Sequence, residues 1–209
     1  LLVMLLSYFF GCFNGSFMVS HFIIRDDVRK HGSGNAGLTN FYRTYGAKYA
    51  LLVIACDMGK TVAACLLGSF FFRCLGWDGT LGTLLAGLGC ELGHIFPVFY
   101  GFRGGKGILS GGTLVLLLNW RVAAVAWALF LLLWLTTRYV SLASITATCS
   151  APITVYFVYG HNWLYTGLCL AVAALVVWCH RENIQRLLHG TEKKFKWHVN
   201  PTEGKEPPK

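Results

Sequence analysis

The chain has 209 residues, of which 55% are hydrophobic and only 13% are charged, and its net charge is +9. This composition is typical of integral membrane proteins and leaves no room for a large soluble domain. The positive charge suits an anionic membrane surface, and without nucleic-acid-binding motifs we expect no nucleic-acid partner.

Apolar stretches predict an all-α integral membrane protein with about seven transmembrane helices. A bilayer core of roughly 30 Å requires about 20 apolar residues per helix. The stretches that approach this length are 1–24, 50–72, 80–100, 108–119, 122–137, 141–159 and 163–179. The segment 108–119 is short, so we expect it to begin in a thinned or re-entrant region or to pack behind its neighbours.

The Lys and Arg residues are divided unevenly between the two sets of loops. Fifteen of them fall in one set, made up of 25–49, 101–107, 138–140 and the tail from 180. The opposite set holds only Arg73 and Arg121. Because positively charged loops remain in the cytoplasm, we predict an outside N-terminus, a cytoplasmic C-terminus and a site that faces the cytoplasm.

The C-terminal part of the chain divides into two. Residues 180–190 have apolar side chains at helical spacing among polar ones, which predicts an interfacial helix that Gly190 ends. Residues 197–209 are polar and proline-rich, so we expect a disordered cytoplasmic tail. The preceding residues, 1–196, are then a single transmembrane domain.

The stretch HGSGNAGLTNFYR, residues 31–43, has the composition of an anion-binding loop. Gly32, Gly34 and Gly37 allow the positive φ values that point successive amides at one anion. The candidate binding residues here are Ser33, Gly34, Asn35, Thr39, Asn40 and Arg43. A polar turn before a capped helix is the alternative, but the density of donors and the guanidinium favour an anion site.

A second glycine-rich stretch, GHIFPVFYGFRGGKG at 93–107, connects two apolar segments. Gly104, Gly105 and Gly107 would let Lys106 and bare amides reach an oxyanion, and His94 precedes a proline that can redirect the chain. The stretch departs from the nucleotide P-loop pattern at two positions, so nucleotide hydrolysis is disfavoured. A positively charged interfacial turn is the alternative.

Several polar residues lie inside or at the ends of apolar spans. Asp57 and Lys60 stand three residues apart within a span and share a helix face. Charged groups there are costly unless they are paired or functional, so we predict an internal ion pair, with contact between Lys60 and substrate as the alternative. Ser141 is a candidate if it lies close to the loops, since serines in membrane helices usually bond to their own backbone or join helices. His180 could bind a hydroxyl or a phosphate together with Asn183, one turn away.

Two other patterns receive a structural interpretation. His21 and Asp26 have the His-x4-Asp spacing of a different acyltransferase superfamily, but five residues of continuous helix rotate them about 140° apart. They would meet only if the helix stopped between them, and we interpret the spacing as a coincidence. The sequence GCELG at 89–93 matches a helix-contact motif and predicts packing. We assign no metal and no cofactor.

Taken in order, GSGNAGLTN with Arg43, GHIFPVFYGFRGGKG and HRENIQRLLHGTEKK resemble the three signature segments of the bacterial acyl-phosphate:glycerol-3-phosphate acyltransferases, the PlsY family. The resemblance runs from the first span to about Lys194. It implies transfer of a fatty acyl group from acyl phosphate to the sn-1 hydroxyl of glycerol 3-phosphate, giving lysophosphatidic acid and phosphate. It also implies a bacterial inner-membrane enzyme, and we expect a monomer with membrane lipids as its other partners.

In this interpretation the loops hold two anionic substrates while the hydroxyl attacks the acyl carbonyl directly. The catalytic candidates are Ser33, Arg43, Lys106, His180 and Asn183. The substrate-binding candidates are Gly34, Asn35, Thr39, Asn40, Lys60, His94, Gly104, Gly105 and Ser141. The general base stays open between the two histidines and a substrate phosphate oxygen.

Two other classes of protein would use similar loops. A phosphate-ester transporter should show polar residues across the bilayer or an inverted repeat, and the sequence shows neither. A scaffold that binds anionic lipid would explain the positive charge but not the glycines.

Overall fold

The computed structural model describes residues 1–197, which form helices, turns and loops without a β-strand. The α-helices are α1 (Leu2–Cys12), α2 (Gly15–Met18), α3 (Leu38–Tyr45), α4 (Ala50–Cys74), α5 (Gly79–Ile95), α6 (Ile108–Leu118), α7 (Trp120–Thr137), α8 (Val140–Val158), α9 (Trp163–Cys179) and α10 (Arg181–Leu188). A π-helix covers Val19–Ile23, and short 3-10 helices cover Val28–Lys30 and Val98–Tyr100. The all-α prediction is confirmed, and the predicted tail lies, from 198 on, outside the described residues.

Polar side chains mark where several of these helices begin. Asp78 accepts a hydrogen bond from the N–H of Thr80 at 2.8 Å at the start of α5, and Asn119 accepts one from Arg121 at 2.9 Å at the start of α7. Asn162 accepts hydrogen bonds from two N–H groups at the start of α9. Each cap satisfies amides that have no partner inside the helix.

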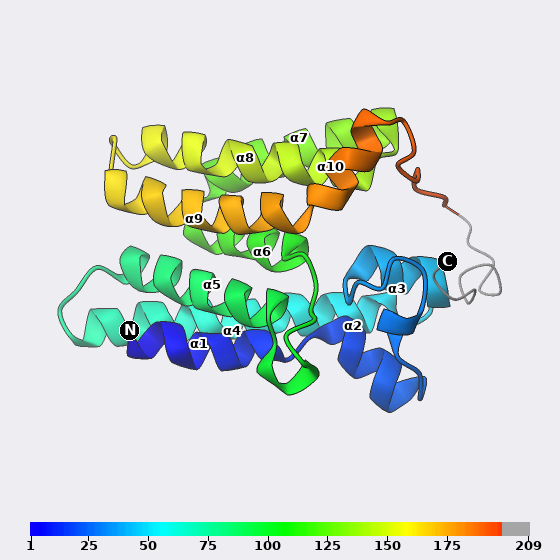
Figure 1. Cartoon of the computed structure of the whole chain (residues 1–209). Helices are drawn as coiled ribbons and strands as arrows, with labels where there is room; N and C mark the ends of the chain where they lie inside the picture. Colours follow the sequence, from blue (N-terminus) through cyan, green and yellow to red (C-terminus); the bar gives the residue numbers. More distant parts are fainter. Residues whose placement is uncertain (198–209) are drawn as a thin grey trace.

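The long helices form two layers, with α6 between them (Figure 1). One layer contains α1, α4 and α5, with α5 packed along both of the others; the second contains α7, α8 and α9. Glycines permit the closest contact, between α1 and α5. A Cβ at Gly89 would lie 3.0 Å from the Cα of Met4, and a Cβ at Gly93 would lie 2.9 Å from the nitrogen of Cys12. The packing predicted for 89–93 is therefore confirmed.

By length and composition, five helical segments among residues 1–197 can cross a membrane. They are Leu2–Ile23, Ala50–Cys74, Gly79–Tyr100, Trp120–Thr137 and Val140–Val158. α9 and α10 add a sixth if they count as one span, and they meet at a bend of 59°. The remaining expected span corresponds to α6, an apolar helix of 11 residues that extends only about 16 Å. α10 ends at Leu188, and Gly190 follows with a φ of 68°, as predicted.

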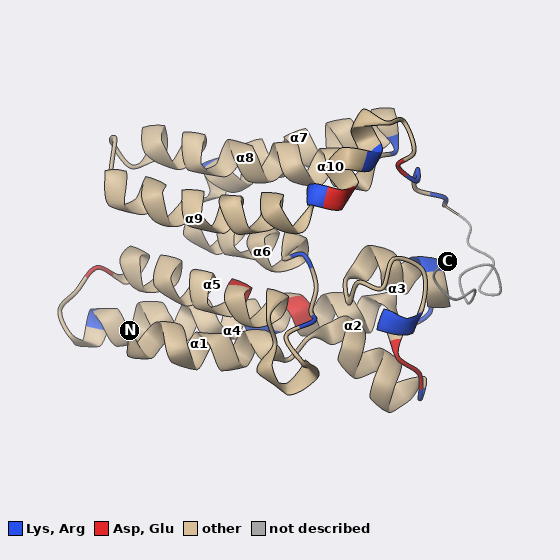
Figure 2. Cartoon of the chain, in the orientation of Figure 1, with Lys and Arg blue, Asp and Glu red and all other residues tan. Residues whose placement is uncertain are grey.

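Most of the cations lie at one end of the two layers. Figure 2 shows Lys and Arg gathered where the connections 24–49, 96–107 and 180–197 meet, which we call the loop end. The opposite end carries the turns that follow α4, α6 and α8, and it has few charges. The loops expected on one side of the membrane thus gather at one end of the molecule. The side that this end faces stays a prediction.

Candidate active site

The first glycine-rich loop, 31–37, is organised around the side chain of Asn40. The Asn40 amide nitrogen donates to three backbone carbonyls, among them that of Asn35 at 3.0 Å. Its amide oxygen accepts the N–H of Ser33 at 3.0 Å. Asn40 is only 4% exposed, so it shapes the loop from beneath. The Asn40 donors that we expected to face substrate are therefore used on the loop backbone.

Two of the three glycines in this loop have the predicted backbone geometry. The φ angle is 59° at Gly32 and 69° at Gly34, which L-residues with a side chain rarely adopt. Gly37 instead has a φ of −117°, because it is the extended residue from which α3 begins, so the positive φ predicted for it is wrong. The N–H of Gly34 donates to the carbonyl of His31 at 2.9 Å, within the loop itself.

The second loop, 101–107, folds back on the last turn of α5. The N–H groups of Gly104 and Gly105 donate to the carbonyls of Ile95 and His94, both at 3.1 Å. These carbonyls have no partner within the helix because α5 ends there. A Cβ at Gly104 would collide with the His94 carbonyl oxygen, and one at Gly105 with the His94 ring. These two amides, which we expected to reach an oxyanion, are therefore bonded within the protein, and the expectation for them is corrected.

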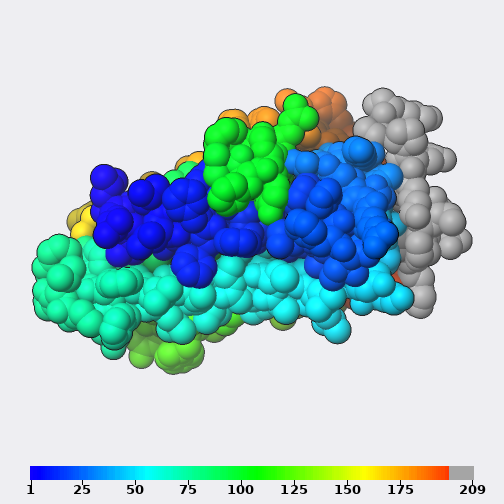
Figure 3. Space-filling view, turned by 90° about the horizontal axis from the view of Figure 1, so that it is seen from below, coloured from blue at the N-terminus to red at the C-terminus, as the bar shows by residue number. Residues whose placement is uncertain are grey.

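The two loops join each other although they are far apart in the sequence. The carbonyl of Gly104 accepts the N–H of Ala36 at 3.3 Å and the side-chain amide of Asn35, 69 residues away, at 3.4 Å. Figure 3 shows the green segment around 96–107 lying over α1 and beside the blue segment of residues 15–45. The predicted anion loops therefore form one continuous surface.

A buried charge cluster from α4 and α5 lies beneath the second loop. The Nζ of Lys60 is 2.9 Å from Oδ1 of Asp57 and 2.8 Å from Nδ1 of His94, and it also donates to the carbonyls of Gly11 and Phe13 at 3.1 Å. The predicted ion pair is confirmed. Because an ammonium has only three donors, the geometry favours a supporting role for Lys60 over contact with substrate.

His94 connects this cluster to the loop. Its Nδ1 accepts a hydrogen bond from the Lys60 ammonium, which leaves the ring proton on Nε2, the nitrogen that lies against Gly105. A neutral imidazole in this tautomer has no free basic nitrogen. His94 is also only 3% exposed. The geometry therefore disfavours His94 both as the general base and as a direct contact to substrate.

The third signature segment meets the second loop at Lys106. The Nζ of Lys106 donates to Oδ1 of Asn183 in α10. The Nδ2 of Asn183 donates to Oε1 of Glu192 at 2.7 Å, and the hydroxyl of Ser141 in α8 donates to the same oxygen at 2.8 Å. The Nε of Arg186 donates to Oε2 of Glu192 at 2.7 Å. Three candidates from different elements thus share one hydrogen-bonded network.

Residues 191–197, which we call the strap, connect Arg43 of α3 to this network. A guanidinium nitrogen of Arg43 donates to the carbonyl of Lys193 at 3.1 Å. The ring of Phe195 stacks on Tyr42, with their centroids 5.3 Å apart. The strap passes from α10 to α3, so the first and third signature segments meet through it.

Positive charge exceeds negative charge around Glu192. Burial and the nearby Arg186 guanidinium lower the pKa of Lys106, and burial lowers the pKa of Arg43. Burial acts to raise the pKa of Glu192, but hydrogen bonds from its three neighbours hold that pKa below its usual range. Glu182 pairs with Arg186 at 3.9 Å from the exposed side. Three cations around one buried carboxylate would be stabilised by a further anion, such as a phosphate.

The remaining candidates lie around this network. His180 is 4% exposed, and its Nδ1 is 2.8 Å from the carbonyl of Val176, which fixes the ring proton there and leaves Nε2 with a free lone pair. Ser33 is exposed and Thr39 is half-buried in the first turn of α3. Among the hydrogen bonds of residues 1–197, neither hydroxyl takes part, and no bond joins Ser33 to Lys106.

The sequence prediction did not include Glu192 or Arg186, which complete the network. Both belong to the segment HRENIQRLLHGTEKK. The sequence does place Glu192 two residues after the helix-ending Gly190 and directly before two lysines, and this pattern could have indicated its role. A carboxylate in such a position is a candidate partner for several cations at once.

The His-x4-Asp spacing does not form a pair. The π-helix does end between the two residues, at Ile23, yet the carboxylate of Asp26 contacts Nε2 of His31 at 2.8 Å. The ring of His21 stacks on Phe17, with their centroids 5.3 Å apart. His21 and Asp26 therefore each contact another residue and do not contact one another.

Fold and site together define a class: a helical integral membrane protein with a cationic hydrogen-bonding network at one end of its spans. The family model described as glycerol-3-phosphate acyltransferase matches residues 1–190. The chain belongs to this family, the PlsY family of integral membrane proteins.

Relatives and a solved structure match this chain over nearly its whole length. A glycerol-3-phosphate acyltransferase of Alkaliphilus metalliredigens is 40% identical, covering 93% of this chain and 95% of its own length. One from Syntrophomonas wolfei is 38% identical, with 92% and 95% covered. The crystal structure of PlsY (YgiH), an integral membrane glycerol 3-phosphate acyltransferase in its glycerol 3-phosphate form, matches with a TM-score of 0.83 at 36% identity, covering 93% of this chain and 94% of that chain.

Proposed function

We propose that this chain is an acyl-phosphate:glycerol-3-phosphate O-acyltransferase. The sn-1 hydroxyl oxygen of glycerol 3-phosphate attacks the acyl carbonyl carbon, the bond from that carbon to the phosphate oxygen breaks, and lysophosphatidic acid and phosphate are released. The observation that carries the proposal is the network in which Lys106, Asn183 and Glu192 join the second and third signature segments. Family membership supports it, because solved relatives include a glycerol 3-phosphate form and a lysophosphatidic acid form.

Both substrates carry phosphate, and the proposed roles follow from the charges around the site. Lys106 and Arg43 bind phosphate oxygens, and the exposed Ser33 hydroxyl contacts the acyl-phosphate head. Asn183 and Ser141 orient glycerol 3-phosphate. Holding two mutually repelling anions in line makes the attack effectively intramolecular. The cations stabilise the negative charge that develops as the carbonyl is attacked.

The hydroxyl proton has two acceptors in this proposal: Nε2 of His180 and a phosphate oxygen of the substrate. His94 is disfavoured because its basic nitrogen is bonded to Lys60. No acyl-enzyme is included, since phosphate is already a good leaving group. Near-normal turnover of a His180→Gln variant would leave the substrate oxygen as the acceptor.

The same proposal places the loop end in the cytoplasm of a bacterial cell, with the N-terminus outside the inner membrane. The distribution of cations supports this orientation. Residues 1–196 are proposed as one acyltransferase domain that acts as a monomer among membrane lipids, without a cofactor.

The test measures phosphate released by purified protein from palmitoyl phosphate, with and without glycerol 3-phosphate. We expect release that depends on glycerol 3-phosphate and equals the amount of 1-acyl lysophosphatidic acid formed. Lys106→Ala should lower kcat/KM about 100-fold, because it removes a charged donor from the reacting phosphate. Lys48→Ala is the matched control: Lys48 is an exposed cation of the loop end that lies over the ring of Tyr49.

Three results would contradict parts of the proposal. Turnover with palmitoyl coenzyme A but not with palmitoyl phosphate would reject the donor, and a 2-acyl product would reject the sn-1 position. Binding of glycerol 3-phosphate without turnover, together with flux into vesicles, would replace the enzyme with a transporter.

A further inference from the structure

A second polar site lies at the end of the molecule opposite the loop end. α4 has 25 residues and extends about 37 Å, whereas α6 has 11 residues and extends about 16 Å. Figure 1 shows that α6 stops short of the turns that follow α4 and α8. A pocket of about 200 Å³ occupies this place, between α4, α5 and the end of α6.

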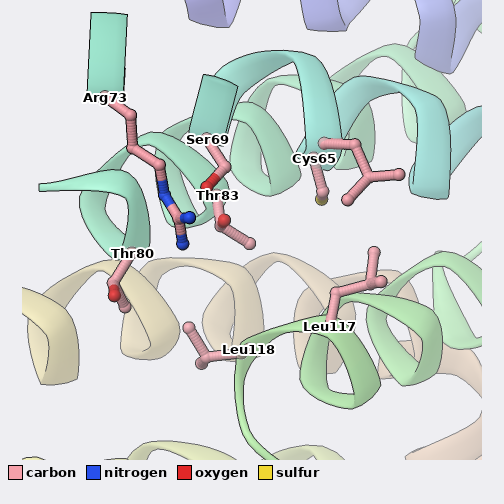
Figure 4. A pocket seen from close by; sticks show the side chains of 8 residues that line it. Cys65, Ser69, Arg73, Thr80, Thr83, Leu117 and Leu118 are labelled. Atoms are coloured by element: carbon pink, nitrogen blue, oxygen red, sulfur yellow. The ribbon is translucent and has the colours of Figure 1, made fainter. Parts of the chain in front are cut away.

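One wall of the pocket is polar and the other is apolar (Figure 4). The residues that matter are Ser69, Arg73, Thr80, Thr83, Leu117 and Leu118. Figure 4 shows the side chain of Arg73 directed into the pocket from the last turn of α4. The polar groups come from α4 and α5. The apolar lining comes from the last turn of α6 and from Cys65 and Leu66 of α4.

The position of Arg73 depends on a glycine. A Cβ at Gly79 would lie 2.5 Å from Nε of Arg73 and 2.8 Å from Oγ of Ser69, so both side chains lie directly over the first residue of α5. A larger residue at 79 would push the guanidinium away from the pocket. Gly79 is buried, so the missing side chain leaves space that Arg73 fills.

Arg73 has hydrogen-bonding capacity to spare. None of the ion pairs among residues 1–197 includes it. The carboxylate of Asp78 caps α5 through the N–H of Thr80, at 2.8 Å, and the hydroxyl of Thr83 donates to the carbonyl of Gly79 at 3.1 Å. The donors left for a ligand are therefore the Arg73 guanidinium and the hydroxyls of Ser69 and Thr80.

The position of the pocket along the candidate spans corresponds to the level at which a phospholipid changes from head group to acyl chain. Two candidate spans, Ala50–Cys74 and Gly79–Tyr100, end and begin beside it. A guanidinium at the end of a span reaches the level of the head-group phosphates. Trp77, in the neighbouring turn, is 60% exposed, as expected of an aromatic side chain at the membrane–water boundary.

We propose that this pocket binds a phospholipid of net negative charge. Arg73 forms a paired hydrogen bond with the lipid phosphate, Ser69 and Thr80 add donors, and one acyl chain lies along Leu117 and Leu118. An anionic lipid is preferred over a zwitterionic one because the arginine has no acidic partner in the pocket to neutralise it. The site is separate from acyl transfer and does not depend on the proposed function.

The experiment is native mass spectrometry of the full-length protein, purified in detergent with equal amounts of phosphatidylglycerol and phosphatidylcholine. We expect the wild type to retain phosphatidylglycerol preferentially and Arg73→Gln to reduce that preference about tenfold, the effect of losing one charge-assisted hydrogen bond. Arg73→Lys should keep most of the preference. Arg121→Gln is the matched control, because Arg121 is the other arginine of this end and does not line the pocket.

Three outcomes would overturn the proposal. An unchanged preference in Arg73→Gln, or an equal loss in Arg121→Gln, would mean that lipid is held by the surface in general. Displacement of phosphatidylglycerol by millimolar inorganic phosphate would mean that free phosphate is the ligand. A circular dichroism spectrum and thermal midpoint of Arg73→Gln equal to those of the wild type, which we expect, show that a lost preference does not come from misfolding.

Discussion

Gly105 connects the buried charge cluster to the candidate active site. Its N–H bonds to the carbonyl of His94, the His94 ring lies against it, and Lys106 follows it directly in the chain. Asp57 and Lys60 hold that ring from the other side. Charges inside a membrane protein are costly. Here the Asp57–Lys60 pair has a role, because it holds the His94 ring against Gly105 and so fixes the backbone from which the Lys106 side chain extends.

We therefore expect Gly105→Ala to damage the site without unfolding the protein. The new Cβ would lie 2.9 Å from Cε1 and 3.0 Å from Cδ2 of His94, so the loop must shift. A shift of about 1 Å should lower kcat/KM for glycerol 3-phosphate about 100-fold. Steady-state kinetics in detergent measure this. In Gly59→Ala, where a Cβ meets nothing within 4 Å, kinetics should be unchanged; equal kinetics in both variants would contradict the role of the loop contact.

At the scale of elements, the strap holds the loop end together. The helices α3, α8 and α10 meet there, and their candidate residues contact one another through Glu192 and Lys193. The strap has no regular secondary structure, so its position depends on these side chains and on the stacking of Phe195. Glu192 is its main polar attachment.

Glu192→Gln should loosen the strap in a manner that depends on pH. We expect a loss of about 1–3 kcal/mol in the free energy of unfolding at pH 7, because hydrogen bonds to a charged acceptor are weakened. The pKa of Glu192 is held below its usual range, so the carboxylate stabilises the fold above the ordinary Glu pKa of about 4.3 and loses this effect as the pH falls through the lowered pKa. The difference between variant and wild type should therefore shrink in acid.

Thermal unfolding between pH 2 and pH 8, followed by circular dichroism in detergent, measures this difference. Glu182→Gln is the control. Glu182 is 67% exposed and pairs with the same arginine at 3.9 Å, so its replacement should change the stability by less than about 0.5 kcal/mol at any of these pH values. A difference for Glu192→Gln that stays constant down to pH 2 would show that its charge does not hold the strap.

The whole molecule has two unlike ends. The loop end combines three signature segments and most of the cations, whereas the opposite end is sparsely charged and carries the Arg73 pocket (Figure 2). The two ends of a membrane-spanning protein face different surroundings, so each end can carry a different site. The proposed acyl transfer and the proposed lipid site would then face opposite sides of the membrane.

Labelling of cysteines in spheroplasts tests this orientation. Cys74 is exposed in the last turn of α4, at the opposite end, and Lys48 is exposed at the loop end. In a variant whose only cysteine is Cys74, a membrane-impermeant maleimide should label intact spheroplasts. A variant whose only cysteine is Lys48→Cys should be labelled only after lysis. The reverse pattern would place the loop end outside.

The sequence by itself determined the membrane class, the gathering of the cationic loops, the Asp57–Lys60 pair and the family. Each rests on short-range information: hydrophobicity summed over about 20 residues, charge counted loop by loop, helical spacing of three, or motifs read in order. These properties do not depend on which distant segments meet, so they could be predicted without the fold.

Only the tertiary structure decided how the polar groups are used. The amides of Gly104 and Gly105 bond to the end of α5, the Asn40 side chain bonds to its own loop, and Glu192 becomes the centre of the network. Lys106 and Asn183 are 77 residues apart, and Arg43 and Lys193 are 150 apart. A donor binds whichever acceptor the packed helices bring within about 3 Å, and that distance is set by the fold rather than by the neighbouring residues.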